Sequence, residues 1–170
     1  MCKLSVSEQD RAEVGELLGR EPRGLEDVSV RDSEGRPSVI RVAPLVDDKP
    51  FPTLYWLVDR DLSYRIDQVE ASGLIAQLQS EIDADPQLQA AMAGEHLRYK
   101  QRREQFMSDR DRQRIEALGF GDVFATKGIG GIADTSRIRC LHTWYAAHLV
   151  EPNTVGRLLD KYWATQAQSH

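Results

Sequence analysis

The stretch Phe51-Pro52-Thr53-Leu54-Tyr55-Trp56-Leu57-Val58 decides how this chain folds. Its apolar and aromatic residues follow one another without the polar alternation of a half-exposed strand. The run therefore predicts a strand that is covered on both faces. Pro52 suits the first residue of such a strand, because proline cannot donate a hydrogen bond to a neighbouring strand. We read the remaining segments as the partners of this strand.

The residues before this stretch predict a short helix and a β-hairpin. Ser7 and the acidic residues after it form a helix start, and the apolar stripe that follows ends at Gly19. From Asp27 apolar and polar residues alternate, residues 32–35 form a turn, and apolar residues continue to Val42. We expect a small, mostly antiparallel three-stranded sheet within about residues 27–58.

The residues after the sheet read as helices. Two apolar stripes at helical spacing meet at Ser72-Gly73, where the glycine either bends one helix or separates two. Asp85-Pro86 marks the start of a long helix that reaches past Phe106, and Ser108 can restart it before Gly119 ends it. The sequence thus predicts an α+β fold, with one domain over residues 1–170 and several α-helices packed on the sheet.

Composition narrows the function classes. The chain has 27 acidic and 22 basic residues, a net charge of -5, which argues against a nucleic-acid partner. No window approaches the roughly 18 apolar residues of a membrane span, and the start lacks the apolar run of a signal peptide. Two cysteines do not make a disulfide framework. We expect a soluble, cytoplasmic protein without a membrane partner.

One face of the long helix combines apolar and polar residues. Its positions recur at spacings of three and four, and they are Leu88, Met92, His96, Tyr99, Arg103 and Phe106. A plain core helix would place leucine at His96 and Arg103. Either both side chains are buried and need polar partners, or they reach the edge of the stripe and Arg103 extends to water.

Most of the candidate chemistry lies between Thr126 and Gly156. A glycine turn before a helix can direct backbone N–H groups and a helix dipole at an anion. The loop Gly128-Ile129-Gly130-Gly131 lacks the ending of a Walker A loop and is not a GxGxxG fingerprint. We therefore expect binding of a small anionic or phosphorylated ligand, with hydrolysis of that ligand as a further hypothesis. The expected ligand-binding residues are Arg41, Arg103, Lys127, Gly130, Gly131 and Arg139, with His96 and His142 for proton transfer.

A metal site is the competing interpretation, because Cys140, His142 and His148 are all possible zinc ligands. If residues 135–150 form one helix, Cys140 and His142 point roughly 160° apart and the two histidines roughly 120° apart. We therefore predict neither a metal nor a cofactor, and read Cys140 as a small apolar residue. A site that uses a second helix stays open. A further hypothesis places His96 and Arg103 opposite residues 139–148 in one shared cleft.

A second function class is a non-catalytic protein-interaction module. Trp144, Tyr162 and Trp163 would contribute to its surface, and residues 155–163 have the helical spacing of a core or dimer face. A homodimer or a protein partner would then use this C-terminal aromatic segment. Exposed aromatic side chains would favour the module, whereas a closed polar pocket around His142 would favour the ligand site.

Several of these segments resemble the uncharacterised bacterial family DUF501, over about residues 19–156. The matching blocks are residues 36–41, 50–57, the Gly-Ile-Gly-Gly loop, His96 with Tyr99, and Cys140-Leu141-His142. The family pattern has lysine in place of Arg139, which keeps the charge, and proline in place of Thr154. The resemblance implies no activity, substrate or cofactor. Related actinobacterial genes often lie beside a septum-formation initiator and an exopolyphosphatase, which associates the family with division or phosphate metabolism.

Overall fold

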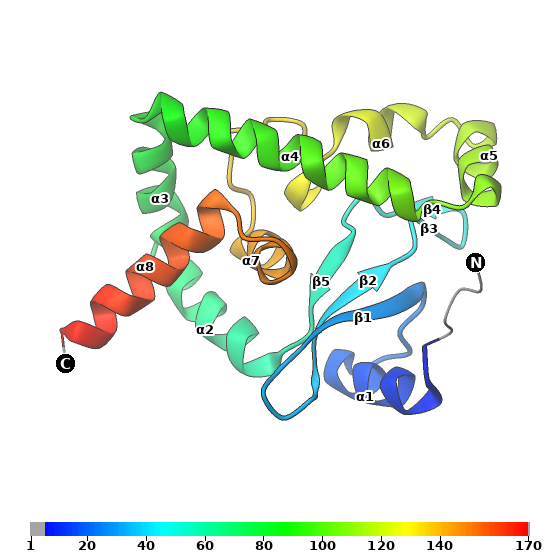
Figure 1. Ribbon diagram of the computed structural model, residues 1–170, viewed down its shortest axis with the longest axis horizontal. Coiled ribbons are helices and arrows are strands. Elements are labelled where there is room, and N and C mark those ends of the chain that lie inside the picture. Colours follow the sequence, from blue (N-terminus) through cyan, green and yellow to red (C-terminus); the bar gives the residue numbers. More distant parts are fainter. Residues whose placement is uncertain (1–5, 170) are drawn as a thin grey trace.

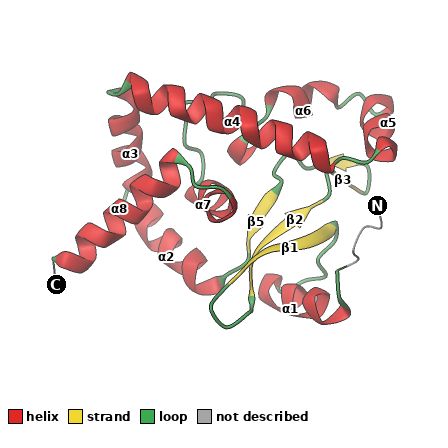
Figure 2. Ribbon diagram, in the orientation of Figure 1, coloured by secondary structure: helices red, strands yellow, loops and turns green. Residues whose placement is uncertain are grey.

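The hairpin expected from the alternating residues forms two strands of a three-stranded antiparallel sheet (Figures 1 and 2). This computed structural model describes residues 6–169. Strands β1 (Leu25–Arg31) and β2 (Pro37–Val42) pair, and β5 (Tyr55–Leu57) pairs with the other side of β2. The pairing of β1 is irregular at three places along the strand. The α+β architecture and the three-stranded sheet are therefore confirmed.

The strand expected over residues 51–58 is shorter than its apolar run. Only Tyr55–Leu57 pairs as β5, because Pro52 cannot donate a hydrogen bond and the Leu54 N–H donates to the Tyr99 hydroxyl at 2.6 Å. A second, two-stranded sheet lies before it and was not expected. It joins β3 (Leu45–Val46) to β4 (Lys49–Pro50).

Helices make up most of the remaining chain. Their bounds are α1 Glu8–Leu18, α2 Arg60–Ala71, α3 Leu74–Asp83, α4 Pro86–Phe106, α5 Asp109–Ala117, α6 Gly121–Thr126, the 3-10 turn η1 Ile129–Gly131, α7 Leu141–Val150 and α8 Thr154–Gln168. The expected caps Ser7 and Ser108 accept backbone N–H groups at two of these starts. Gly73, with φ of 92°, separates α2 from α3 rather than bending one helix. None of the helices that the structure describes combines the length and apolar sequence needed to cross a membrane.

Helix α7 occupies the middle of the main core. It packs against β5, α2 and α8, and α4 runs along one side of this group (Figure 1). Trp144 of α7 is completely buried, and Tyr162 and Trp163 of α8 pack against the same core. Trp144 therefore lies inside the fold, whereas Tyr162 and Trp163 are only partly buried against it. Helix α1 covers the other face of the sheet, where Ile40 belongs to a separate apolar cluster.

His96 and Arg103 on the mixed face of α4 are buried, which was one of the two alternatives expected from the sequence. His96 and Arg103 are 1% and 2% exposed. Arg103 does not extend to water: its guanidinium donates to the carbonyl oxygens of Pro52, Phe124 and Lys127 at 2.6, 2.6 and 2.8 Å. A buried cation is thus bound by backbone dipoles, and it ties α4 to the segment before β5 and to the end of α6.

Replacing Arg103 tests how much these hydrogen bonds contribute to the stability of the fold. We expect Arg103→Gln to lower the free energy of unfolding by at least about 3 kcal/mol, because it leaves buried carbonyls without donors. The matched control is Arg102→Gln, whose guanidinium forms a half-exposed ion pair with Glu151 and should contribute less than about 1 kcal/mol. Urea unfolding of both variants measures the difference. Equal effects would mean that the buried cluster contributes no more than a surface ion pair.

Candidate functional site

The expected helix over residues 135–150 begins only at Leu141, which corrects the sequence-based geometry. Cys140 is the residue before the helix and has extended backbone angles, φ -152° and ψ 125°. The segment before it is attached to α3, because the Gln79 side chain binds both the Ser136 carbonyl and the Ile138 N–H. The argument that Cys140 and His142 diverge on one helix is therefore wrong.

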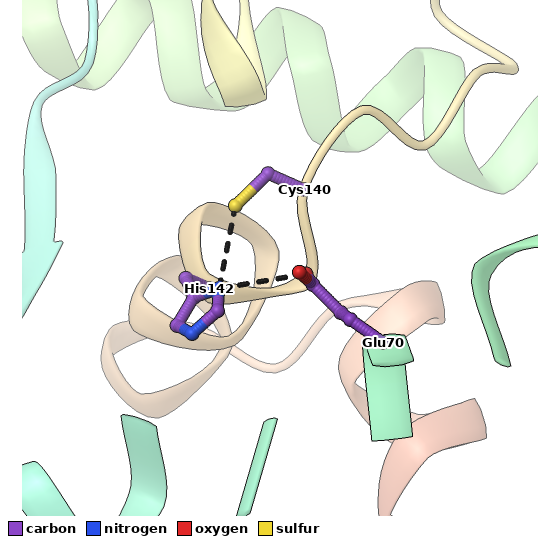
Figure 3. A group of neighbouring side chains, drawn as sticks. All are labelled: Glu70, Cys140 and His142. Atoms are coloured by element: carbon purple, nitrogen blue, oxygen red, sulfur yellow. Dashed lines mark hydrogen bonds and ion pairs between the residues drawn. The ribbon is translucent and has the colours of Figure 1, made fainter. Parts of the chain in front are cut away.

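Cys140, His142 and Glu70 of α2 converge at the start of α7 (Figure 3). The His142 Nδ1 atom lies 3.5 Å from Cys140 Sγ and 3.4 Å from Glu70 Oε1. All three possible ligand atoms lie within 4.8 Å of one another. The Glu70 carboxylate also accepts the Leu141 N–H at 2.7 Å, so a carboxylate of the protein occupies the N-terminus of α7.

The second ring nitrogen of His142 faces helix α2. Its Nε2 atom lies 2.9 Å from Asp67 Oδ1 and 3.3 Å from the Ser63 carbonyl oxygen. The imidazole is thus held between Cys140 and Glu70 on one side and α2 acceptors on the other. This arrangement fixes which way the ring points.

The interaction between Cys140 and His142 shifts the pKa values of both side chains. The hydrogen bond to Cys140 raises the pKa of His142 to about 9, against the effect of burial and with help from the Glu70 and Asp67 carboxylates. Burial alone would raise the pKa of the Cys140 thiol, but the hydrogen bond to His142 and the Thr143 N–H outweigh burial and lower it. The interaction with His142 therefore shifts Cys140 toward its thiolate form.

Two of the three separations in this group, both from the His142 Nδ1 atom, match the edges of a metal tetrahedron. Zinc bound to cysteine, histidine and carboxylate at ordinary bond lengths places sulfur about 3.6 Å and oxygen about 3.4 Å from the nitrogen. The corresponding distances here are 3.5 and 3.4 Å. The group can bind a cation between its members, or it can share the His142 proton between Cys140 and Glu70.

His96 and His142, expected in one site, have different partners. His96 Nδ1 accepts the Ile129 N–H at 3.0 Å, and its ring meets the Trp144 ring edge-on. A Cβ atom on Gly128 would lie 2.2 Å from that nitrogen, so the glycine loop closes directly on His96. The polar partners of His142 lie instead on α2 and at Cys140.

The expected ligand-binding residues are distributed over several elements. Arg41 pairs with Glu26 at 2.6 Å and lies over the Phe106 ring, whereas Arg103 binds carbonyls, including that of Lys127. Gly130 and Gly131 have left-handed φ values of 80° and 69° in η1. Arg139 is exposed, precedes Cys140, and lines an open groove together with Arg137.

The two carboxylates of α2 were missed from the sequence. Asp67 and Glu70 are three residues apart and share a helix face, a pattern that could have been set against Cys140-Leu141-His142. His148 lies outside the cluster. Its Nε2 atom is 2.8 Å from Asp160 Oδ2 and its Nδ1 atom accepts the Asn153 N–H, which joins α7 to α8.

The comparisons with known proteins identify the family. Residues 28–161 match DUF501, described as a protein of unknown function, and the chain belongs to this family. No curated protein and no solved structure matches it.

His96 gives the fold a pH dependence that can be measured. Burial, with a smaller effect from Lys100, lowers the pKa of His96 to about 4, and its Nδ1 must stay unprotonated to accept the Ile129 N–H. In the unfolded chain a histidine titrates near about 6.5. The stabilisation is therefore complete above pH 6.5 and is lost as the pH falls toward 4, to a limit of about 3 kcal/mol.

The comparison of wild type with His96→Gln isolates this effect. Glutamine can accept the same N–H but does not titrate, so the variant should lose less stability than wild type between pH 7 and pH 4.5. Chemical unfolding at the two pH values gives the difference. The same pH dependence in both proteins would show that His96 is not the group responsible.

Proposed function

We propose that Glu70, Cys140 and His142 bind a divalent transition metal ion, with zinc preferred. The observation that supports this most is the convergence of a cysteine sulfur, an imidazole nitrogen and a carboxylate, with nitrogen–sulfur and nitrogen–oxygen distances typical of tetrahedral zinc. Thiolate and imidazole ligands suit zinc better than magnesium or calcium, which take oxygen ligands. The three residues come from α2 and from the start of α7, two elements that pack together.

The surroundings of His142 support the same ion. A histidine that binds metal through one nitrogen almost always donates its other N–H to a carboxylate or a carbonyl. His142 has both acceptors at Nε2, the Asp67 carboxylate and the Ser63 carbonyl. Asp67 would therefore orient the ring and make Nδ1 a better ligand without binding the metal itself.

A nucleophilic thiolate is the competing use of the pair, and the position of Glu70 argues against it. The Leu141 N–H would be a natural donor to a developing oxyanion, but it already donates to Glu70. The Glu70 carboxylate also opposes ionisation of the Cys140 thiol, and a protonated His142 offsets only one of the two negative charges. A metal ion balances both negative charges.

Three protein ligands leave one tetrahedral position for water or substrate, as in catalytic zinc sites. We therefore propose that the bound ion supports hydrolysis by lowering the pKa of its water ligand. The anionic ligand expected from the sequence stays part of this proposal. Arg139 is exposed and lines, with Arg137, a groove that contains none of the three ligands; its charge would attract such a substrate to the neighbourhood of Cys140.

The zinc content of the purified protein tests the proposal directly. After loading with zinc chloride and gel filtration, elemental analysis should give about one zinc per chain. His142→Ala and Cys140→Ser should fall to near background, while Cys2→Ser, the matched thiol control, should keep one zinc. Asp67→Asn should also keep one zinc but bind it about 10- to 100-fold more weakly.

Cobalt substitution separates the ligands from one another. Co²⁺ in the wild-type site should show a sulfur-to-metal charge-transfer band that Cys140→Ser removes. Wild-type protein with less than a tenth of an equivalent of zinc, or His142→Ala with unchanged zinc, contradicts the proposal. The proton-sharing alternative then describes the cluster.

Arg139 provides a separate prediction about the substrate. Pyrophosphate should bind zinc-loaded Arg139→Gln about tenfold more weakly than zinc-loaded wild type, because one charge-assisted contact is lost. Zinc content should be equal in the two proteins. Lys161→Gln, which removes a charge on the exposed side of α8, is the control for bulk electrostatics. Equal affinities at matched ionic strength would exclude Arg139 from the site.

A further inference from the structure

A cavity of about 190 Å³ lies on the face of the sheet that α1 covers. It opens beside the end of α1 and the β3–β4 hairpin, and none of the proposed metal ligands lines it. We name it the α1-side cavity. Its apolar walls are Leu18, Leu25, Ile40, Val42, Phe51 and Trp56.

The interior of the α1-side cavity suits an aromatic or branched apolar group. Phe51 and Trp56 face each other at a ring distance of 6.4 Å and an angle of 52°. The Trp56 N–H already donates to the Thr53 carbonyl, so the indole offers the cavity an apolar surface. An apolar cavity of about 150 Å³ is enough for benzene, so this volume admits a ring with a small substituent.

The mouth of the cavity carries charged side chains. Arg23 is paired with Asp47 at 2.7 Å. Arg20 and Lys49 also lie at the mouth, and neither side chain has an ion-pair partner among residues 6–169. Glu21 is the one remaining carboxylate there, so unpaired positive charge exceeds unpaired negative charge. A carboxylate on the ligand complements this mouth.

The wall formed by the β3–β4 hairpin is held in place at its turn. Asp47 and Asp48 both have left-handed backbone angles, with φ of 51° and 59°. Arg114 of α5 binds the Asp48 carboxylate through two hydrogen bonds of 2.9 and 2.6 Å, and Arg23 binds Asp47. Ion pairs from two sides thus fix an uncommon turn that shapes the cavity.

We propose that the α1-side cavity binds a small monocarboxylate with an aromatic or branched apolar body. The body lies between Phe51, Trp56 and the strand side chains, and the carboxylate meets Arg20 and Lys49. This site is separate from the metal cluster and does not depend on the proposed function. It gives the chain a second small-molecule ligand of a different chemical class.

Phenylacetate is the probe, with the neutral phenylacetamide and the cationic phenethylamine as matched ligands. Titration calorimetry of wild type should give a dissociation constant on the order of 0.1–1 mM for phenylacetate, as expected for a ligand of this size. The amide and the amine should bind at least tenfold more weakly. Equal or tighter binding of either analogue overturns the carboxylate assignment.

Two variants locate the site. The double variant Arg20→Gln with Lys49→Gln should weaken phenylacetate binding at least tenfold and leave phenylacetamide unchanged. Val46→Phe, which fills the cavity from the hairpin wall, should abolish binding of both. An unchanged affinity in either variant overturns the proposal.

A spectroscopic measurement covers the case in which Val46→Phe lowers stability. Phenylacetate should shift the Trp56 indole N–H resonance of wild type, which is assigned by its loss in Trp56→Phe. A titration in which that resonance stays fixed, or in which phenylacetate does not bind at 10 millimolar, refutes the cavity as the binding site.

Discussion

The fold depends on the polar stripe along one face of α4. Arg103 donates to three carbonyl groups, Tyr99 accepts the Leu54 N–H, and His96 accepts the Ile129 N–H. Most of these backbone partners lie in segments without regular secondary structure. Side chains of α4 thus satisfy buried backbone groups that regular secondary structure would otherwise have paired. Because one rigid helix carries all three side chains, the segment before β5 and the glycine loop take fixed positions against the α7 core.

Features set by neighbouring residues could be predicted from the sequence. The hairpin, the caps of α1 and α5, the start of α4 and its mixed face all follow from spacing and local hydrogen bonding. The late start of α7 could not be predicted, because Gln79 holds the preceding residues from 57 and 59 positions away. The same holds for Glu70, which reaches Leu141 across 71 residues. The prediction that Arg103 binds a ligand rested on its charge, and charge alone does not show that its guanidinium is bound to carbonyls.

Glu70 has two roles: it caps the start of α7 and it is one of the proposed metal ligands. Its carboxylate compensates the positive end of α7 and also lies beside the His142 nitrogen. A carboxylate has enough lone pairs to accept an N–H and bind a metal ion together. The site is therefore positioned before any ion arrives, since the helix start already orients Glu70 and Asp67 already orients His142. Such preorganisation reduces the conformational entropy that ion binding must overcome.

The irregular pairing of β1 has a consequence for how copies of the protein meet. As one of the two outer strands of the sheet, β1 presents backbone groups on which a strand of another molecule could align. Its three register irregularities twist and interrupt that row, and Asp27 and Arg31 place charges along it. A strand added from another molecule would find mismatched hydrogen-bonding groups, and it would have to bury the charges of Asp27 and Arg31. This edge of the sheet is thus protected against the edge-to-edge growth from which β-aggregates form.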